Sequence, residues 1–204
     1  MTAPVGRRER KKAATRQALA DTALNLFLEH GYDHVTIRDI AEAVDVSTTT
    51  LLKYFATKEA LVFDEDTEQE AALVSAVRDR PEGQSIPQAL CAHIKHVRIS
   101  ADGSDARFAA FVRLVNTTPA LGEYAHRMWM RHEDALACAI AEATGSRPDD
   151  YRCAALAHFA LESSAFAQRA DDPERAVDTA FALLEHGWGG ECHELGGNFT
   201  GRDT

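Results

Sequence analysis

Hydroxyl and lysine side chains cluster in the first third of the chain. The segment from Ser47 to Tyr54 reads S-T-T-T-L-L-K-Y, with four consecutive hydroxyl residues followed by a lysine and a tyrosine. Such side chains suit hydrogen bonds to phosphate oxygens and to the polar edges of bases. A helix beginning at Thr48 places Thr48, Thr49, Lys53 and Tyr54 on its exposed face.

Residue types that serve catalysis or metal binding are present, but their spacing does not form a site. The nine histidines include the pairs His93/His96 and His126/His132, and neither pair has the further ligands of a zinc site. The sequence lacks H-E-x-x-H, G-x-S-x-G and the phosphate-binding loop of nucleotide hydrolases. We therefore expect no enzyme activity, no metal site and no cofactor.

Composition indicates a cytoplasmic globular protein. Hydrophobic residues make up 45% of the chain and charged residues 26%. No apolar run approaches the roughly 18 residues that a membrane span needs, and the N-terminal residues lack the apolar core of a signal peptide. The four cysteines, at positions 91, 138, 153 and 192, form no C-x-x-C pair. We expect free thiols, with the first three buried.

Three helix starts surround the hydroxyl cluster. Thr36, Ser47 and Thr57 can each cap a helix that begins at the next residue, because their side-chain oxygens accept bonds from backbone N–H groups that lack an intrahelical partner. Asp39 follows Thr36 by three residues, which resembles a capping box with Asp in place of Glu. The three caps predict two short helices and the start of a third.

The apolar pattern between these caps predicts a helix-turn-helix. Two apolar stripes at helical spacing flank Asp45, which tolerates the left-handed backbone of a tight turn; they comprise Ile37, Ile40, Ala41 and Val44, then Leu51, Leu52 and Phe55. In such a motif the second helix enters the DNA major groove. Helix-turn-helix shapes also occur in proteins that do not touch DNA, so the motif by itself leaves both interpretations open.

Longer stretches of sequence resemble the DNA-binding domain of the TetR family of transcriptional regulators. The resemblance rests on T-R-Q-A-L-A-D-T-A-L-N-L-F-L-E-H-G-Y from Thr15, T-I-R-D-I-A-E-A from Thr36 and V-S-T-T-T-L-L-K-Y-F-A-T-K-E-A-L from Val46. Three residues depart from the family pattern. Asp45 stands where the family usually has Gly, Thr49 where it has Gly or another small residue, and Leu52 where it has a Tyr that commonly touches DNA phosphate.

The resemblance implies a set of DNA-contacting residues. We assign this role to residues of the two short helices and the segment that follows them: Arg38, Ser47, Thr48, Thr49, Thr50, Lys53, Tyr54 and Lys58. Leu52 puts one backbone contact of the family in doubt. Tyr54 and Lys58 match the family at their positions.

Charge is divided along the chain in a way that favours DNA approaching one end. Residues 1–58 carry nine Lys and Arg against seven Asp and Glu, a net charge of +2, whereas residues 59–204 carry thirteen against twenty-five, a net charge of −12. Five cations lie close together at the start: Arg7, Arg8, Arg10, Lys11 and Lys12. Such a run is a solvated terminus or an arm that reaches the DNA backbone or minor groove.

The whole chain reads as about nine helices, an all-α fold. We predict a helix-turn-helix domain at 1–58, a helical regulatory domain at 59–189, and a disordered tail at 190–204. The first domain includes a bracing helix from about Lys11 to His30, with a buried stripe that begins at Ala14 and with Gly31 as its C-cap. The fourth helix is expected from Lys58 to about Arg80. The later helices are separated by Gly, Asp and Pro punctuation, and no strand pattern or internal repeat is present in the sequence.

The last two long helices indicate a homodimer. The segments from Ala154 to Ala167 and from Ala176 to Trp188 are rich in small and apolar residues on more than one face, so each must be covered on most sides. A second copy of the chain would provide that cover in a four-helix interface, as TetR-like proteins do. The alternative is a pair of interior helices in a larger core.

Mixed aromatic and polar residues in the middle helices suggest a ligand pocket. The resemblance implies a small-molecule site, and our candidate lining is Phe108, Phe111, Trp129, His158 and Phe159. The alternative is that the aromatic rings form core and the polar groups lie on the surface.

Together these features predict a ligand-responsive transcriptional regulator. We expect a repressor that binds a palindromic DNA operator as a homodimer and is released by a small, largely apolar effector. The alternative is an interaction protein with a helix-turn-helix shape and no DNA affinity. The operator, the effector and the regulated genes do not follow from the sequence.

Overall fold

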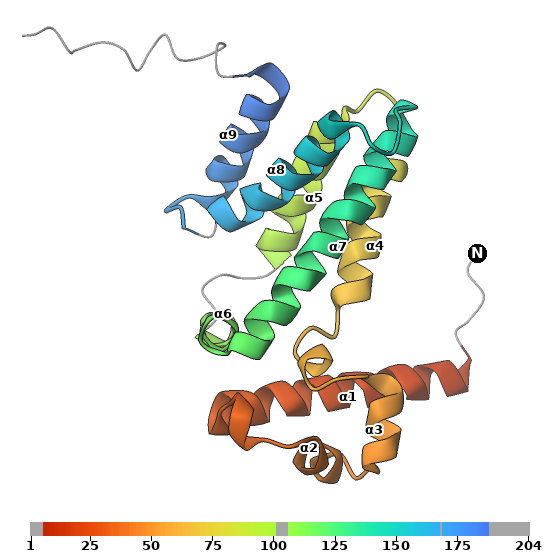
Figure 1. The fold of residues 1–204 in the computed structure, drawn as a ribbon, viewed down its shortest axis with the longest axis vertical. Helices are drawn as coiled ribbons and strands as arrows, with labels where there is room; N and C mark the ends of the chain where they lie inside the picture. Colours follow the sequence, from red (N-terminus) through yellow and green to blue (C-terminus); the bar gives the residue numbers. More distant parts are fainter. Residues whose placement is uncertain (1–5, 101–105, 168, 188–204) are drawn as a thin grey trace, which may run out of the picture. The chain divides into compact units, whose positions relative to one another are not determined.

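The computed structural model describes residues 6–100, 106–167 and 169–187 (Figure 1). Within these residues every regular element is a helix, which confirms the predicted all-α fold. The elements are α1 (Arg7–His30), η1 (Tyr32–His34), α2 (Ile37–Ala43), α3 (Thr48–Tyr54), η2 (Glu59–Leu61), α4 (Asp66–Arg78), α5 (Ile86–Ser100), α6 (Ala106–Thr117), α7 (Pro119–Thr144), α8 (Tyr151–Ala167) and α9 (Pro173–His186). The predicted tail at 190–204 lies outside the described residues.

Contacts divide the described residues into two compact units. The first unit comprises residues 6–69 and 106–130, and the second comprises residues 70–100, 131–167 and 169–187. Helices α1, α2, α3 and α6 belong to the first unit and α5, α8 and α9 to the second, while α4 and α7 contain residues of both. The predicted boundaries after residues 58 and 189 concern function and stay a prediction.

The core of the first unit fixes the short helices against α1. Leu19, Ala23 and Phe27 lie on one stripe of α1 and are at most 1% exposed, and they share a core with Leu51 and Phe55. The stripe does not begin at Ala14, as the sequence suggested, because Ala14 is exposed. Each fully buried large side chain contributes roughly 1.5–3 kcal/mol. A seven-residue helix such as α3 has marginal stability alone, so this core holds it in place.

The ends of α1 show one predicted and one unpredicted feature. Gly31 ends the helix with a φ of 85°, and its N–H donates to the Phe27 carbonyl at 2.9 Å, which confirms the predicted C-cap. The helix begins at Arg7 rather than near Lys11. The basic residues at its start therefore lie on the first turns of a helix.

The fourth helix begins later than the sequence predicted. Residues 59–65 form a 3-10 turn and further turns, and α4 starts at Asp66 rather than Lys58. The Val62 N–H donates to the Glu59 carbonyl at 2.9 Å, and the Asp66 N–H donates to the Phe63 carbonyl at 3.2 Å. These bonds span three residues instead of four, because the segment turns to bury both Leu61 and Val62 in the core.

In the second unit α9 packs on both α5 and α8. The Lys95 ammonium on α5 lies 3.0 Å from a Glu174 carboxylate oxygen and 2.9 Å from one of Asp178, both on α9.

Cys153 is buried on α8, but Cys91 is half-buried and Cys138 is exposed, so the expectation that all three are buried was wrong. None of the described helices combines the length and the apolar character that crossing a membrane requires.

The turn between α2 and α3 is built from backbone bonds around one left-handed residue. Asp45 has a φ of 54° and is the only non-glycine residue with a positive φ in the described part of the chain. Its N–H donates to the Glu42 carbonyl at 3.1 Å, and the Val46 N–H donates to the Ala41 carbonyl at 2.9 Å. This pair of bonds is a Schellman motif, and the predicted role of Asp45 in a tight turn is confirmed.

Replacing Asp45 tests the strain in this turn. A left-handed backbone costs an L-residue roughly 1–2 kcal/mol, less for Asp than for most, and costs glycine little. We expect Asp45→Gly to raise the free energy of unfolding by up to about 1 kcal/mol and Asp45→Val to lower it by about 1–2 kcal/mol. Urea denaturation followed by circular dichroism measures both.

Asp33→Gly is the matched control, because Asp33 has no positive φ. That change should not raise the free energy of unfolding. An Asp45→Gly protein no more stable than the wild type would show that the turn stores no strain.

Candidate nucleic-acid interface

Side-chain caps set the start of each short helix. The Thr36 hydroxyl accepts from the Asp39 N–H at 3.2 Å, and an Asp39 carboxylate oxygen accepts from the Thr36 N–H at 2.8 Å, so the predicted capping box is present. The hydrogen bonds from the Thr36 backbone and side chain hold the pKa of Asp39 below its usual range. The Ser47 hydroxyl accepts from the Thr50 N–H at 3.1 Å and lies 2.8 Å from the Thr50 hydroxyl. The hydroxyls of Ser47 and Thr50, two residues assigned to DNA contact, are therefore hydrogen-bonded to each other within the N-cap of α3.

The outward face of α3 carries unengaged polar side chains. Thr48, Thr49 and Lys53 are exposed, and their side chains have no hydrogen-bond or ion-pair partner among the described residues. On the opposite side of the same helix, Leu51 is fully buried. The burial of one face therefore directs two hydroxyls and an ammonium outward from a fixed helix, in reach of an approaching surface.

Arg38 lies on the exposed side of α2. Its guanidinium Nε is 2.7 Å from a Glu42 carboxylate oxygen, one helical turn further on, and 78% of its side chain is exposed. An exposed ion pair of this kind contributes little stability, because solvent screens the charges. Arg38 is therefore free to exchange Glu42 for a phosphate at low energetic cost.

Two residues assigned to DNA contact are held by the core instead of projecting from it. Tyr54 is half-buried and packs against the core of the first unit. The Lys58 ammonium donates to the Tyr32 carbonyl and lies 3.9 Å from the centre of the Tyr32 ring. Burial lowers the pKa of Lys58 despite nearby carboxylates. The sequence did not indicate this inward role, because Lys58 meets Tyr32 only through the tertiary fold.

Arg16 is a residue of this interface that sequence reasoning missed. Its guanidinium stacks on the Phe55 ring at 4.5 Å, donates to the Tyr54 carbonyl at 3.3 Å and also donates to the Asp64 carbonyl. One side chain of α1 thus holds both the C-terminal end of α3 and the segment before α4. The available signal was its position on the buried stripe of α1, four residues before Ala20, where a charged residue needs partners.

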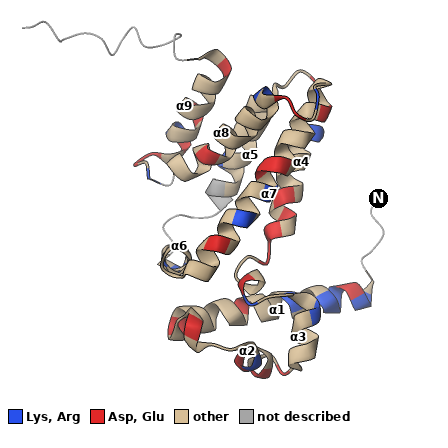
Figure 2. Cartoon of the chain, viewed as in Figure 1, with Lys and Arg blue, Asp and Glu red and all other residues tan. Residues whose placement is uncertain are grey.

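Positive charge gathers at the start of α1, as Figure 2 shows. Five cations occupy its first two turns, all exposed: Arg7, Arg8, Arg10, Lys11 and Lys12. Figure 2 also shows acidic residues along α4 and α7. The helix gives the cations a regular spacing, whereas the sequence left their conformation open.

The two predicted ligand-pocket residues on α6 pack against each other, and Phe111 also packs against the core of the first unit. The rings of Phe108 and Phe111 stack with their centres 6.3 Å apart, and both residues are half-buried. Phe111 also packs edge-on against Phe63, at 6.1 Å. Trp129 is half-buried on α7.

The remaining pocket residues lie on α8 in the second unit. His158 Nδ1 is 3.0 Å from a Glu133 carboxylate oxygen on α7, and its ring meets the Phe159 ring at 5.4 Å. Phe159 is 53% exposed. The structure therefore forms two pairs, Phe108 with Phe111 and His158 with Phe159, which belong to different units. A pocket shared by all five predicted residues stays a prediction.

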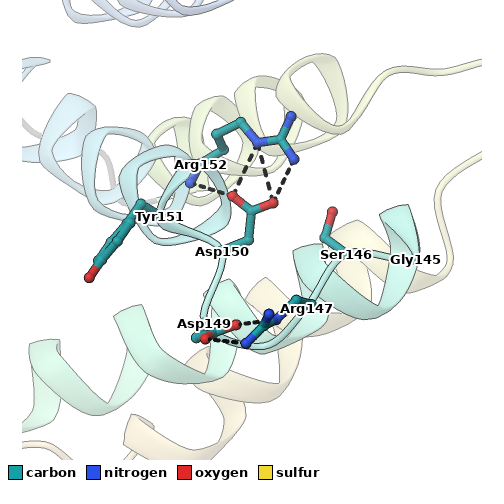
Figure 3. Close-up of a pocket in the computed structure, with 7 residues that line it drawn as sticks. All are labelled: Gly145, Ser146, Arg147, Asp149, Asp150, Tyr151 and Arg152. Atoms are coloured by element: carbon teal, nitrogen blue, oxygen red, sulfur yellow. Dashed lines mark hydrogen bonds and ion pairs between the residues drawn. The ribbon is translucent and has the colours of Figure 1, made fainter.

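An open surface depression of about 720 Å³ lies at the turn between α7 and α8 (Figure 3). Its two arginines are both paired: Arg147 with Asp149 at 2.9 Å and Arg152 with Asp150 at 2.6 Å. Hydrogen bonds from the Arg152 side chain and backbone lower the pKa of Asp150 to about 2. None of the predicted ligand residues lines this depression, whose charges are already neutralised. Among the described residues, no group of three or more His, Cys, Asp or Glu could hold a metal ion.

Comparison with known proteins places this geometry in a family. Residues 19–64 match the model for bacterial regulatory proteins of the tetR family. The chain is 38% identical over 152 residues to the HTH-type transcriptional regulator TcmR of Streptomyces glaucescens, covering 71% of this chain and 67% of that protein.

Two solved structures share the fold. One is a TetR-family regulator from Streptomyces coelicolor, with a TM-score of 0.58 and 17% identity over 90% of this chain and 97% of that one. The other is Salmonella enterica GusR, with a TM-score of 0.55 and 21% identity over 85% and 95% of the two chains.

Removing the Arg16 guanidinium tests its role in holding α3. Arg16→Gln loses the stack on Phe55 and at least one hydrogen bond to a helix-end carbonyl, so we expect the free energy of unfolding to fall by about 1–3 kcal/mol. Amide hydrogen exchange in residues 51–55 should become faster than in the wild type, whereas exchange in α9 should stay unchanged, since only the first unit is weakened. Denaturation and exchange mass spectrometry measure the two effects.

Gln17→Ala is the matched control, because Gln17 is exposed and, among the described residues, its amide donates only to the Asp21 carboxylate one helical turn further on, at 3.2 Å. Equal stability and equal α3 exchange in the Arg16 and Gln17 variants would contradict the clamp.

Proposed function

Because the chain belongs to the TetR family of bacterial regulatory proteins, we propose that it is a cytoplasmic repressor that binds a palindromic operator as a homodimer and is released by a small, largely apolar ligand. Regulators of this family are ligand-responsive DNA-binding proteins, typically repressors, and not enzymes. The single observation that carries the proposal is the outward face of α3, where Thr48, Thr49 and Lys53 project from a helix fixed by its buried side.

The proposed reading of DNA divides the polar residues by role. Lys53 and Arg38 are exposed cations, which suit phosphate oxygens and add affinity without sequence information. Thr49 lies near the start of α3, where recognition helices contact base edges. The cations at the start of α1 would add further phosphate contacts, since each neutralised phosphate releases counterions.

A second copy of the chain would cover exposed apolar residues of the second unit. Phe159 and Phe166 are seven residues apart on α8, hence on one face, and are 53% and 55% exposed. Leu183 on α9 is 40% exposed. Burial of these side chains between two copies favours association, and two α3 helices must then match successive major grooves about 34–36 Å apart. The exposed face of Phe159 favours this role over lining the ligand pocket.

Ligand release requires a difference between two states of the protein. An effector changes operator affinity only to the extent that it binds one conformation more tightly than the other. Helix α4 contains residues of both units, and Arg16 holds the segment directly before it, at Asp64. We propose that effector binding acts on the position of α3 through this segment.

The DNA-binding proposal is tested by salt-dependent binding. The full chain should bind a duplex selected from a randomised pool with an affinity that falls steeply with salt, and Lys53→Ala should weaken binding to every sequence and reduce the salt slope by about 1. Thr49→Ala should instead change the preference among sequences. Fluorescence anisotropy at several salt concentrations measures both.

A chain without measurable affinity for any duplex at low salt would support the alternative, an interaction protein with this shape. Equal loss at every sequence from both changes would contradict the proposed division of roles.

The dimer proposal is tested by placing charge on the exposed face of α8. Phe159→Glu combined with Phe166→Glu should convert a dimer to a monomer in sedimentation velocity, because an interface does not bury unpaired carboxylates. Val97→Glu is the control, since Val97 is also an exposed apolar residue, 48% exposed, but lies on α5. Identical sedimentation of the two variants would place the interface elsewhere.

A further inference from the structure

One large apolar side chain lies on the polar face of the recognition helix. Leu52 is 49% exposed, whereas the adjacent Leu51 is fully buried, so the expectation that Leu52 shares one apolar stripe with Leu51 and Phe55 was wrong. At about 100° per residue, Leu52 projects between the directions of Thr48 and Thr49, one turn further along α3. The exposed face of α3 is therefore not uniformly polar: its centre is an isobutyl group, bordered by two threonines and Lys53.

The packing of the first unit does not account for the outward position of Leu52. The buried core of the unit contains Leu51 and Phe55 from this part of the chain, and Leu52 belongs neither to that core nor to the partly buried side chains around it. An exposed leucine leaves its apolar surface in water, a cost that burial against an apolar group would remove. A surface that binds α3 should therefore offer an apolar group opposite residue 52.

The major groove of DNA offers one such group. Its floor presents hydrogen-bond donors and acceptors at every base pair, and its apolar feature is the C5 methyl group of thymine. We propose that Leu52 is a specificity-determining residue, which packs against the C5 methyl of a thymine in each half-site of the operator. This inference rests on the proposed function.

Other occupants fit the surroundings of Leu52 less well. A leucine cannot donate a hydrogen bond to phosphate, so it cannot replace the tyrosine that the family commonly has there for backbone contact. A protein partner would need roughly 800 Å² of complementary surface on each side, and the residues around Leu52 on α3 are Thr48, Thr49 and Lys53. A single isobutyl group between hydroxyls matches a single methyl group between polar base edges.

Deoxyuridine separates the methyl group from every other feature of thymine. It keeps the pairing and the O4 acceptor and lacks only the C5 methyl. The full wild-type chain first selects its duplex from a randomised pool. The thymines of that duplex are then replaced by deoxyuridine one at a time, and binding to each modified duplex is measured. We expect one position in each half-site at which the replacement weakens binding about fourfold, because the complex then buries one methyl group less. Replacement at that position in both half-sites should weaken binding about fifteenfold.

Three variants assign the methyl contact to a residue. Leu52→Ala keeps a good helix former at an exposed position, so it should fold normally by circular dichroism and bind the thymine and deoxyuridine duplexes equally. Lys53→Ala should weaken binding to both duplexes and keep their ratio. Thr49→Ser removes a different methyl group from the same face and should also keep the ratio.

The outcomes separate this inference from the proposed function. A wild-type chain that selects no duplex would refute the DNA-binding function and the inference with it. A chain that binds DNA with no thymine sensitive to loss of its methyl group, or whose sensitivity survives Leu52→Ala, would refute the inference alone. Loss of the sensitivity in Thr49→Ser rather than in Leu52→Ala would assign the contact to Thr49.

Discussion

The exposed face of α3, formed by Thr48, Thr49, Leu52 and Lys53, depends on the anchoring of a helix that is too short to be stable by itself. We call this exposed face the reading face. Helix α3 has seven residues, and its position comes from the burial of Leu51 and Phe55, from the Ser47 cap and from the Arg16 guanidinium at its far end. Buried side chains fix which side faces inward, so the same contacts fix which side chains face outward. The reading face is therefore ordered before any partner binds, so DNA binding does not include the entropic cost of ordering α3.

Local features of this face could be predicted from the sequence. The caps at Thr36 and Ser47, the turn at Asp45 and the helix end at Gly31 each depend on residues within five positions of one another, so the sequence contains all that is needed. The nine α-helices of the described part of the chain were predictable for the same reason, because apolar periodicity and punctuation are local signals.

Tertiary contacts account for what the sequence missed. Lys58 resembles a DNA-contacting lysine in its motif, yet Tyr32, twenty-six residues earlier, binds its ammonium. The fourth helix begins at Asp66 because Leu61 and Val62 both enter a core built mainly by other elements. Arg16 contacts carbonyls 38 and 48 residues away, so its place on the stripe of α1 indicated a need for partners but not which ones. A pocket for the proposed ligand would depend on packing of the same long-range kind, and its lining stays a prediction.

The most direct test of this account is to map where DNA touches the molecule. The full chain, labelled with ¹⁵N, is titrated with the duplex that it selects, and amide chemical shifts are followed for all assigned residues. The account predicts the largest changes at residues 47–53, with further changes at 7–12 where the cations of α1 lie. Changes confined to α8 and α9, with residues 47–53 unaffected, would contradict it.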